Sequence, residues 1–179
     1  MSMLTIASGQ VDKIVVAPLL GFAILGNYSL SVQVISVMLI LPNVFQKYLL
    51  PQESTGVKNK KPKIIVIVFS VFITILGIFV APILINELFP KFSEAVDAIR
   101  IMSLVIIPTT ISLILESEFL GNEKSRVVLI GTAILVTSLI IGMLVLGSLM
   151  GIEGVAYSLV IAHTSKLGFY LIAKKFSAT

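Results

Sequence analysis

The stretch IIVIVFSVFITILGIFVAPILIN, residues 64–86, decides the fold class of this chain. Its 23 residues carry no formal charge and are almost all aliphatic or aromatic. A helix rises about 1.5 Å per residue, and about 20 apolar residues are enough to cross the hydrocarbon layer of a bilayer. We therefore expect this stretch to form one membrane-spanning helix.

The rest of the chain has the same apolar character. Of its 179 residues, 57% are hydrophobic and only 12% are charged, and the mean hydropathy is +1.09. Soluble domains carry about 25% charged residues, so this chain has too few ionised side chains to cover a globule in water. The net charge of +4 sits in short clusters between apolar runs. That pattern is typical of contact with a lipid surface, and we expect no nucleic-acid partner.

Uncharged runs elsewhere in the chain predict further spans. Backbone groups in lipid must bond within their own segment, so we expect helices rather than strands. The predicted fold class is all-α: a single transmembrane domain, residues 1–179, built as a polytopic bundle of about six helices. The expected helices cover residues 1–17, 22–48, 63–87, 93–119, 126–147 and 152–174.

Proline and glycine predict where these helices bend or end. The uncharged run 14–46 is too long for one straight span, and we expect it to break near Pro18, Gly21 and Gly26. Pro108 predicts a kink in the middle of the membrane, where neighbouring hydroxyl side chains can bond the freed carbonyls. The glycines of 142–154 permit either close helix approach or a tight turn, and we favour the turn.

Basic residues alternate along the predicted connections. They are frequent in the Lys-rich loop 51–63, in GNEKSR (121–126) and in the tail that holds Lys174 and Lys175. They are few in the three connections that lie between these, near residue 20, at 86–100 and at 147–154. By the positive-inside rule we expect a multi-pass protein of the cell (plasma or inner) membrane, with its Lys-rich loops and C-terminus in the cytoplasm.

The motifs of common enzyme classes are missing from the sequence. There is no phosphate-binding glycine loop, no dinucleotide fingerprint, no HExxH and no nucleophile elbow. The chain has no cysteine and one histidine, which excludes thiolate and multi-histidine metal centres. We therefore expect no enzyme activity, no cofactor and no metal, and we favour transport or scaffolding in the membrane.

Polar side chains inside the predicted spans are the candidates for function, because placing them against lipid is costly. Asp12 and Lys13 lie near the end of the first segment. They either line a polar cavity or mark a helix end at the outer interface, with Lys13 extended toward water. Asn27 and Tyr28 open the next segment, and either line the cavity or form a helix start with an interfacial aromatic ring.

Two further sets of polar residues share helix faces. His163, Lys166 and Tyr170 recur at spacings of three and four, which places them on one stripe of the last helix. The stripe either lines the cavity, or His163 makes an interhelical hydrogen bond while Lys166 extends to the nearby interface. Asp97 and Arg100, three residues apart, are expected to pair at the outer rim and are candidates for a gate. An exposed pair of this kind contributes little stability.

Several strings, taken in order, resemble a known family. They are QVDKIVVAPLLGFAILGNYSLS, LPNVFQKYLLPQES, APILINELFPKFSEAV, FLGNEKSR and GIEGVAYSLV. Together they resemble the C-terminal half of the polysaccharide or O-antigen flippases, which are polysaccharide biosynthesis proteins of the multidrug/oligosaccharidyl-lipid/polysaccharide exporter superfamily. The family's aspartate followed by a basic residue looks like Asp12 and Lys13. Its glycine and tyrosine at a helix start look like Gly26 and Tyr28.

The resemblance implies one lobe of a two-lobe exporter that moves polyprenyl-diphosphate-linked glycans by alternating access. A missing N-terminal lobe or a partner chain would complete it, and membrane lipid would hold the isoprenoid tail. Asp12, Lys13, His163 and Lys166 would then line the cavity, with the cations holding the diphosphate. Two alternatives stay open: half of an ion-coupled multidrug-type exporter, and a non-transporting membrane scaffold for glycan assembly.

Overall fold

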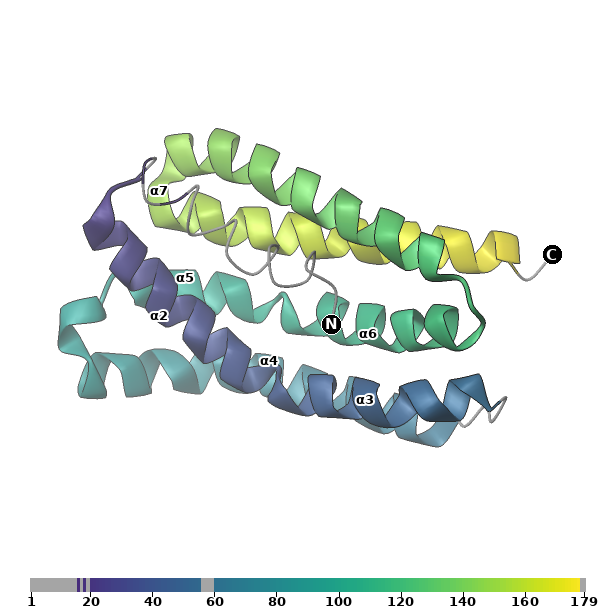
Figure 1. Cartoon of the computed structure of the whole chain (residues 1–179). Coiled ribbons are helices and arrows are strands. Elements are labelled where there is room, and N and C mark those ends of the chain that lie inside the picture. Colours follow the sequence, from purple (N-terminus) through teal and green to yellow (C-terminus); the bar gives the residue numbers. More distant parts are fainter. Residues whose placement is uncertain (1–15, 17, 19, 56–59, 178–179) are drawn as a thin grey trace.

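The structure is a computed structural model that describes residues 16, 18, 20–55 and 60–177. The described residues fold into helices and contain no strand, which confirms the all-α fold class (Figure 1). The expected helix 1–17 falls almost wholly outside them. The elements are α2 (Phe22–Met38), α3 (Ile40–Ser54), α4 (Lys60–Leu88), the short 3₁₀ helix η1 (Pro90–Phe92), α5 (Ala95–Ser103), α6 (Ile106–Gly121) and α7 (Ser125–Ser177).

The last helix, α7, is a hairpin of two helical arms, residues 125–150 and 152–177 (Figure 1). The chain reverses at Gly151, whose φ of 61° and ψ of −134° interrupt the helix. Glycine reaches this left-handed region without a steric penalty. The arms match the expected helices 126–147 and 152–174, and the predicted tight turn is confirmed.

The same glycines also bring the two arms of α7 close together. A Cβ on Gly154 would overlap the backbone carbonyl of Leu146, and one on Gly142 would lie 2.9 Å from the Cβ of Ser158. Both expectations for this stretch therefore hold, since the turn and the close approach occur together.

The expected helix 22–48 is wrong as one continuous element. It begins after Gly21, whose φ is 85°, and bends by 46° between α2 and α3 at Leu39. Pro42 explains the bend, because it has no N–H to donate to the carbonyl four residues before it. The break expected near Gly21 is confirmed, whereas Gly26 continues the helix.

The expected helix 93–119 is likewise two helices. Between α5 and α6 the chain bends by 42°. The bend lies around Leu104, four residues before Pro108, so the carbonyl of Leu104 is the one that Pro108 cannot bond. The predicted kink is confirmed, although the hydroxyl of Thr110 donates to Ile106 O, at 2.8 Å, and not to the freed carbonyl.

The predicted Lys-rich loop 51–63 is wrong in extent. α3 continues to Ser54 and α4 begins at Lys60, so only five residues lie between the two helices. Ion pairs explain the longer helices, because Lys63 in the first turn of α4 contacts Glu53 in the last turn of α3. The predicted helix 63–87 is confirmed as α4, three residues longer at its start and one at its end.

Two helices, α4 and α7, are long and apolar enough to cross a membrane, and there are up to four candidate spans if each bent pair counts as one. Because α7 folds back at Gly151, each of its arms would extend about 39 Å, which exceeds the hydrocarbon thickness of about 30 Å. These lengths and compositions fit a membrane protein.

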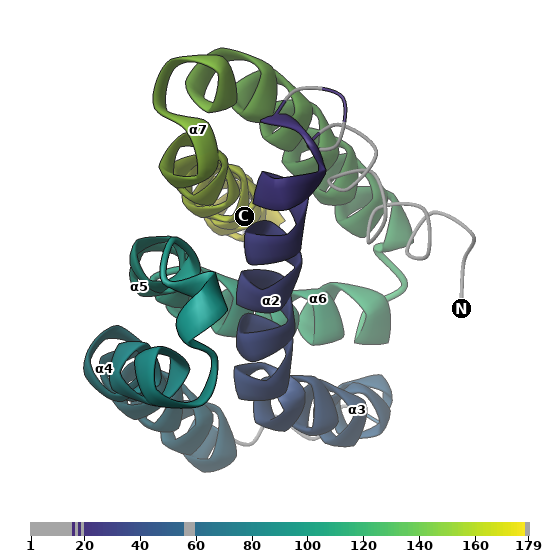
Figure 2. The same ribbon diagram turned by 90° about the vertical axis from the view of Figure 1, so that its left-hand side faces the viewer.

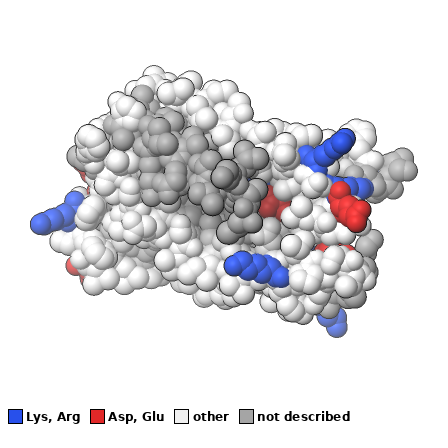
Figure 3. All heavy atoms as spheres, viewed as in Figure 1, with Lys and Arg blue, Asp and Glu red and all other residues white. Residues whose placement is uncertain are grey.

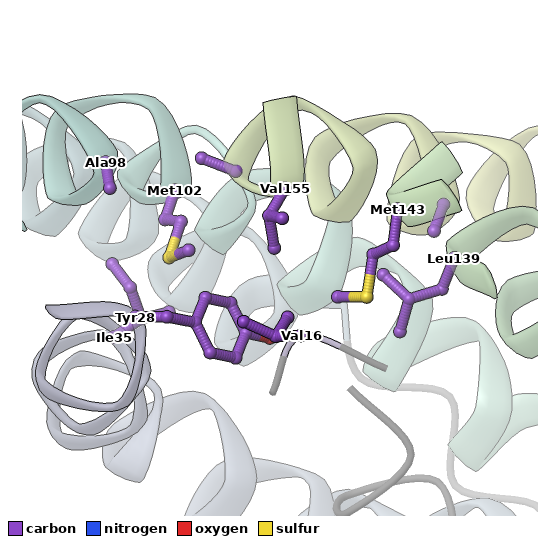
Figure 4. Packing of buried hydrophobic residues seen from close by; sticks show 10 residues of the cluster. Val16, Tyr28, Ile35, Ala98, Met102, Leu139, Met143 and Val155 are labelled. Carbon is purple, nitrogen blue, oxygen red and sulfur yellow. The ribbon is translucent and has the colours of Figure 1, made fainter. Parts of the chain in front are cut away.

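The core lies where α2, α5 and α7 meet. α5 runs between α4 and α7 beside α2 (Figure 2), and six of its nine residues are buried. Tyr28, Met102, Met143 and Val155 are almost fully buried in this cluster (Figure 4). The short helix α5 therefore packs against α4 on one side and α7 on the other, and joins them through its buried residues.

The helix ends that carry the described lysine clusters lie at one end of the bundle. The end of α3, the start of α4, the α6–α7 connection and the end of α7 share that end, whereas the start of α2, η1 and the reversal of α7, which is at Gly151, share the other (Figure 1). We call these the basic end and the Gly151 end. The predicted alternation of basic and neutral connections is therefore confirmed as an arrangement in space.

Candidate functional site

Polar side chains connect α6 to the second arm of α7 at three levels between the middle of the bundle and its basic end. Both helices run toward the basic end, so partners further along one helix meet partners further along the other (Figure 1). The first level is Thr109 with His163; the second is Glu116 with Gln46, Lys166 and Tyr170; the third is Glu118 with Glu53, Lys63 and Lys174.

The first level is a single interhelical hydrogen bond. Thr109 Oγ1 lies 2.8 Å from His163 Nδ1. Thr109 directly follows Pro108, so the kinked end of α6 presents this hydroxyl to α7. The arrangement agrees with the alternative that the sequence left open for His163, an interhelical hydrogen bonder.

The second level is a carboxylate with three donors. Glu116 Oε1 lies 2.5 Å from Lys166 Nζ and accepts a hydrogen bond of 2.8 Å from the hydroxyl of Tyr170. Gln46 Nε2 donates to the other oxygen, Oε2, over 3.2 Å. The side chains of Lys166 and Glu116 are only 12% and 10% exposed. A buried charge is costly unless it is paired and hydrogen-bonded, and both conditions are met here.

The packing around Tyr170 fixes this level. Its ring is fully buried and lies against Gly131 of the first arm, where a Cβ would overlap it. Lys166 Nζ is 5.5 Å from the ring centroid, within reach of a cation–π contact. The sequence predicted that Lys166 and Tyr170 share one face of the last helix, and in the structure both side chains contact Glu116 of α6. Lys166 pairs inside the bundle instead of extending to the interface.

Glu116 is the functional candidate that the sequence reasoning missed. It lies three residues before the end of the expected helix 93–119, close to Glu118, where an ionised carboxylate costs little and draws no functional expectation. The helix continues to Gly121, which places Glu116 more than one turn inside it. The sequence does contain a signal for this pair. Glu116 and Lys166 carry opposite charges inside two predicted spans, and charge complementarity favours a contact between them.

The third level joins four helices at the basic end. Lys63 Nζ of α4 lies 2.5 Å from Glu53 Oε1 of α3 and 2.7 Å from Glu118 Oε1 of α6. Lys174 Nζ of α7 lies 2.6 Å from the second oxygen of Glu118. Two lysines and two glutamates thus form a neutral ion cluster, and the sequence reasoning identified none of these pairings.

Asn27 and Tyr28 lie in the second turn of α2 and not at its start. Asn27 Nδ2 donates to Glu94 Oε2 over 3.0 Å. The ring of Tyr28 is fully buried in the core (Figure 4), so the expectation of an interfacial ring is wrong. The cause is the packing of α2 against α5, because Tyr28 lies on the face of α2 that turns inward, toward Met102 and Val16.

The remaining candidates lie apart from the three levels. Arg100 and Asp97 pair at 3.0 Å, with side chains 52% and 61% exposed, so the predicted pairing is confirmed while the gate stays a prediction. Asp12 and Lys13 lie outside the described residues. Within the residues that the structure does describe, no three His, Asp or Glu side chains gather as a metal ion would require.

Comparison with known proteins finds no relative of this chain. No family model, curated protein or solved structure matches the chain.

Proposed function

We propose that this chain is one lobe of a flippase that moves polyprenyl-diphosphate-linked glycans across the cell membrane by alternating access. The observation that carries the proposal is the ion pair of Glu116 and Lys166 inside two otherwise apolar helices. Ionisable groups within membrane segments are costly and point to transport or coupling. The ordered sequence strings supply the substrate class, which the ion pair alone does not.

The three polar levels support a lobe that moves as one body. The ion cluster and the Glu116 level connect α3, α4, α6 and α7, so sliding of one helix past another would break several charged contacts at once. Rocking of a rigid lobe against a second lobe keeps them all. In this proposal the levels hold the lobe together, and substrate is handled on its faces.

The basic end is assigned to the cytoplasm. Its lysines would attract the anionic inner leaflet and the diphosphate of the incoming lipid. The isoprenoid tail stays in membrane lipid, and a second lobe supplies the opposite wall of the path. Asp12 and Lys13 remain candidates for that path, because they match the family's aspartate–basic pair.

Deletion of the gene tests this function. We expect lipid-linked saccharide to accumulate on the cytoplasmic leaflet, with rescue by the wild-type chain together with its partner lobe. Loss of the lipid-linked product itself would indicate the scaffold alternative. Unchanged saccharide with increased sensitivity to lipophilic cations would indicate the multidrug-type alternative, in which Glu116 would serve ion coupling. Either of these results would contradict the proposal.

A further inference from the structure

Two bent helix pairs lie side by side in the bundle. The pairs α2–α3 and α5–α6 both run from the Gly151 end to the basic end (Figure 1), with α2 packed against α5 and α3 packed against α6. They bend by similar angles, 46° and 42°. A proline follows each bend, Pro42 in one pair and Pro108 in the other, so a helical hydrogen bond is missing at both places. Each pair is therefore most easily deformed at its bend.

Both bends meet α4 at a single residue, Gly77. Met38 is the last residue of α2, and Ser103 is the last residue of α5. A Cβ added to Gly77 would overlap the hydroxyl of Ser103, and it would lie 2.8 Å from the Ser103 Cβ and 3.2 Å from Met38 Cε. The two bends therefore lie at the same level of the bundle, and the missing side chain of Gly77 lets both helix ends approach α4.

Between the bends and the Gly151 end, α2 and α5 are bonded to each other. Asn27 Nδ2 donates to Glu94 Oε2 over 3.0 Å, just before α5 begins. The buried hydroxyl of Ser31 lies 3.4 Å from the carbonyl oxygen of Ala95, the first residue of α5. These contacts couple the start of α5 to the second and third turns of α2. We therefore treat α2, η1 and α5 as one body, residues 22–38 and 90–103, and call it the outer unit.

The outer unit packs against the other helices through apolar side chains. Ile99 of α5 lies in one cluster with Ala81 and Ile85 of α4, and Met102 lies in another with Val155 of α7. Apolar contacts are non-directional, so packed helices can shift against each other without losing a specific bond. The three polar levels join α3, α4, α6 and α7, and most charged side chains on the face seen in Figure 3 lie toward the basic end. Charge therefore fixes the part of the lobe that the outer unit does not include.

We propose that the outer unit pivots about Gly77 against the rest of the lobe, and that this pivot changes how closely α5 approaches the reversal of α7. Two missing backbone bonds at one level make a hinge axis, and Gly77 gives the bend points room to turn. The inference goes beyond the proposed function, because it adds a motion within one lobe to the rocking of whole lobes. The pivot carries Asp97 and Arg100 on α5, which gives a mechanical basis to the gate role expected for this pair.

Distances between spin labels test the pivot, because the native chain has no cysteine that would also be labelled. Ser93→Cys with Ser148→Cys, the outer label pair, reports the outer unit against the end of the first α7 arm. Ser54→Cys with Ser125→Cys, the basic label pair, reports the basic end, and all four serines are exposed. Pulsed electron paramagnetic resonance measures both pairs in the full chain in lipid bilayers. We expect two distances for the outer label pair and one narrow distance for the basic label pair. One narrow distance for both, or equally broad distances for both, would overturn the proposal.

Substitution at the pivot tests the role of Gly77. In Gly77→Ala the added methyl pushes Ser103 away from α4, so we expect the ratio of the two outer distances to change about tenfold. The double variant Gly77→Ala with Ser103→Gly removes the overlapping side chain and should restore the wild-type ratio. Gly168→Ala is the control and should leave the ratio unchanged, because its methyl meets nothing within 4 Å. A ratio that Gly77→Ala does not change, or that the double variant does not restore, would overturn the pivot at Gly77.

These measurements do not depend on the cargo, so they separate the pivot from the proposed function. Two outer distances in a protein whose deletion traps no lipid-linked saccharide would contradict the proposed function alone. Trapped saccharide in the deletion strain, with one narrow outer distance in the chain, would contradict the pivot alone.

Discussion

The two ends of the bundle are held together by different forces. At the basic end the ion cluster of Glu53, Lys63, Glu118 and Lys174 joins four helices. At the Gly151 end the backbones of the two α7 arms touch, with Gly154 against Leu146. Charge therefore holds one end and close packing holds the other, and the two should respond differently to salt and to substitution.

The difference also bears on motion. Ion pairs are screened by salt, and a charged side chain can change its partner. Two backbones in direct contact have no alternative partners, and salt does not weaken their packing. Among the described residues, the Gly151 end carries the exposed Asp97–Arg100 pair and the hydrogen bond between Asn27 and Glu94. Substitutions at each end can therefore test which contacts carry the stability of the lobe.

The largest effect is expected at the second level, from Glu116→Leu. The change leaves the ammonium of Lys166 buried without its counter-ion, and removing one partner of a buried pair costs about 3–5 kcal/mol. Reversible unfolding in mixed micelles, followed by circular dichroism, measures the loss. The control is the double variant Glu116→Leu with Lys166→Met, in which no charge is left alone and most of the stability should return. A double variant as unstable as the single one would show that the pair is not the cause.

The next effect is expected at the Gly151 end, from Gly154→Ala. The added methyl meets the Leu146 carbonyl, so the two arms must separate, at a cost of about 1–3 kcal/mol. Gly168→Ala is the matched control on the same arm, because its added methyl meets nothing within 4 Å. The control should lose no stability, since alanine favours a helix more than glycine does. Equal losses in both variants would contradict the close-packing account.

A smaller and salt-dependent effect is expected from Lys63→Met in the ion cluster. The variant leaves Glu53, whose side chain is 3% exposed, without its counter-ion, while Glu118 keeps Lys174. Lys63 and Glu118 are 15% and 20% exposed, so water can reach the carboxylate of Glu53 through the space that the Lys63 ammonium leaves, and this lessens the penalty. We expect a loss of about 1–2 kcal/mol at low salt that shrinks at high salt. The loss in Gly154→Ala should stay constant over the same salt range. A salt-independent loss in Lys63→Met would remove the distinction between the two ends.

The sequence predicted the helices well, because apolar runs and glycine or proline positions act locally. The span 63–87, the turn at Gly151 and the kink before Pro108 all follow from single-segment chemistry. The bend at Leu39 was not predicted although Pro42 marks it, because Pro18, Gly21 and Gly26 indicate breaks earlier in the same uncharged run.

The site was predicted less completely, because its geometry depends on partners far apart in the chain. The stripe of His163, Lys166 and Tyr170 was identified from spacing, but nothing local pairs Lys166 with a carboxylate 50 positions earlier. Asp97 and Arg100 were paired correctly because they are three residues apart on one helix. Contacts within one helix were therefore accessible to sequence reasoning, and contacts between helices were not.

The smallest effect is expected from Asp97→Asn, which removes the exposed pair with Arg100 at the Gly151 end. Both side chains are more than half exposed, so solvent competes with the pair, and the change should cost no more than about 0.5 kcal/mol. The same unfolding measurement checks this. A transport defect in Asp97→Asn with unchanged stability would give the pair the gate role predicted from its position. A loss as large as that of Lys63→Met would instead mean that charge also holds the Gly151 end, and the contrast between the two ends would fail.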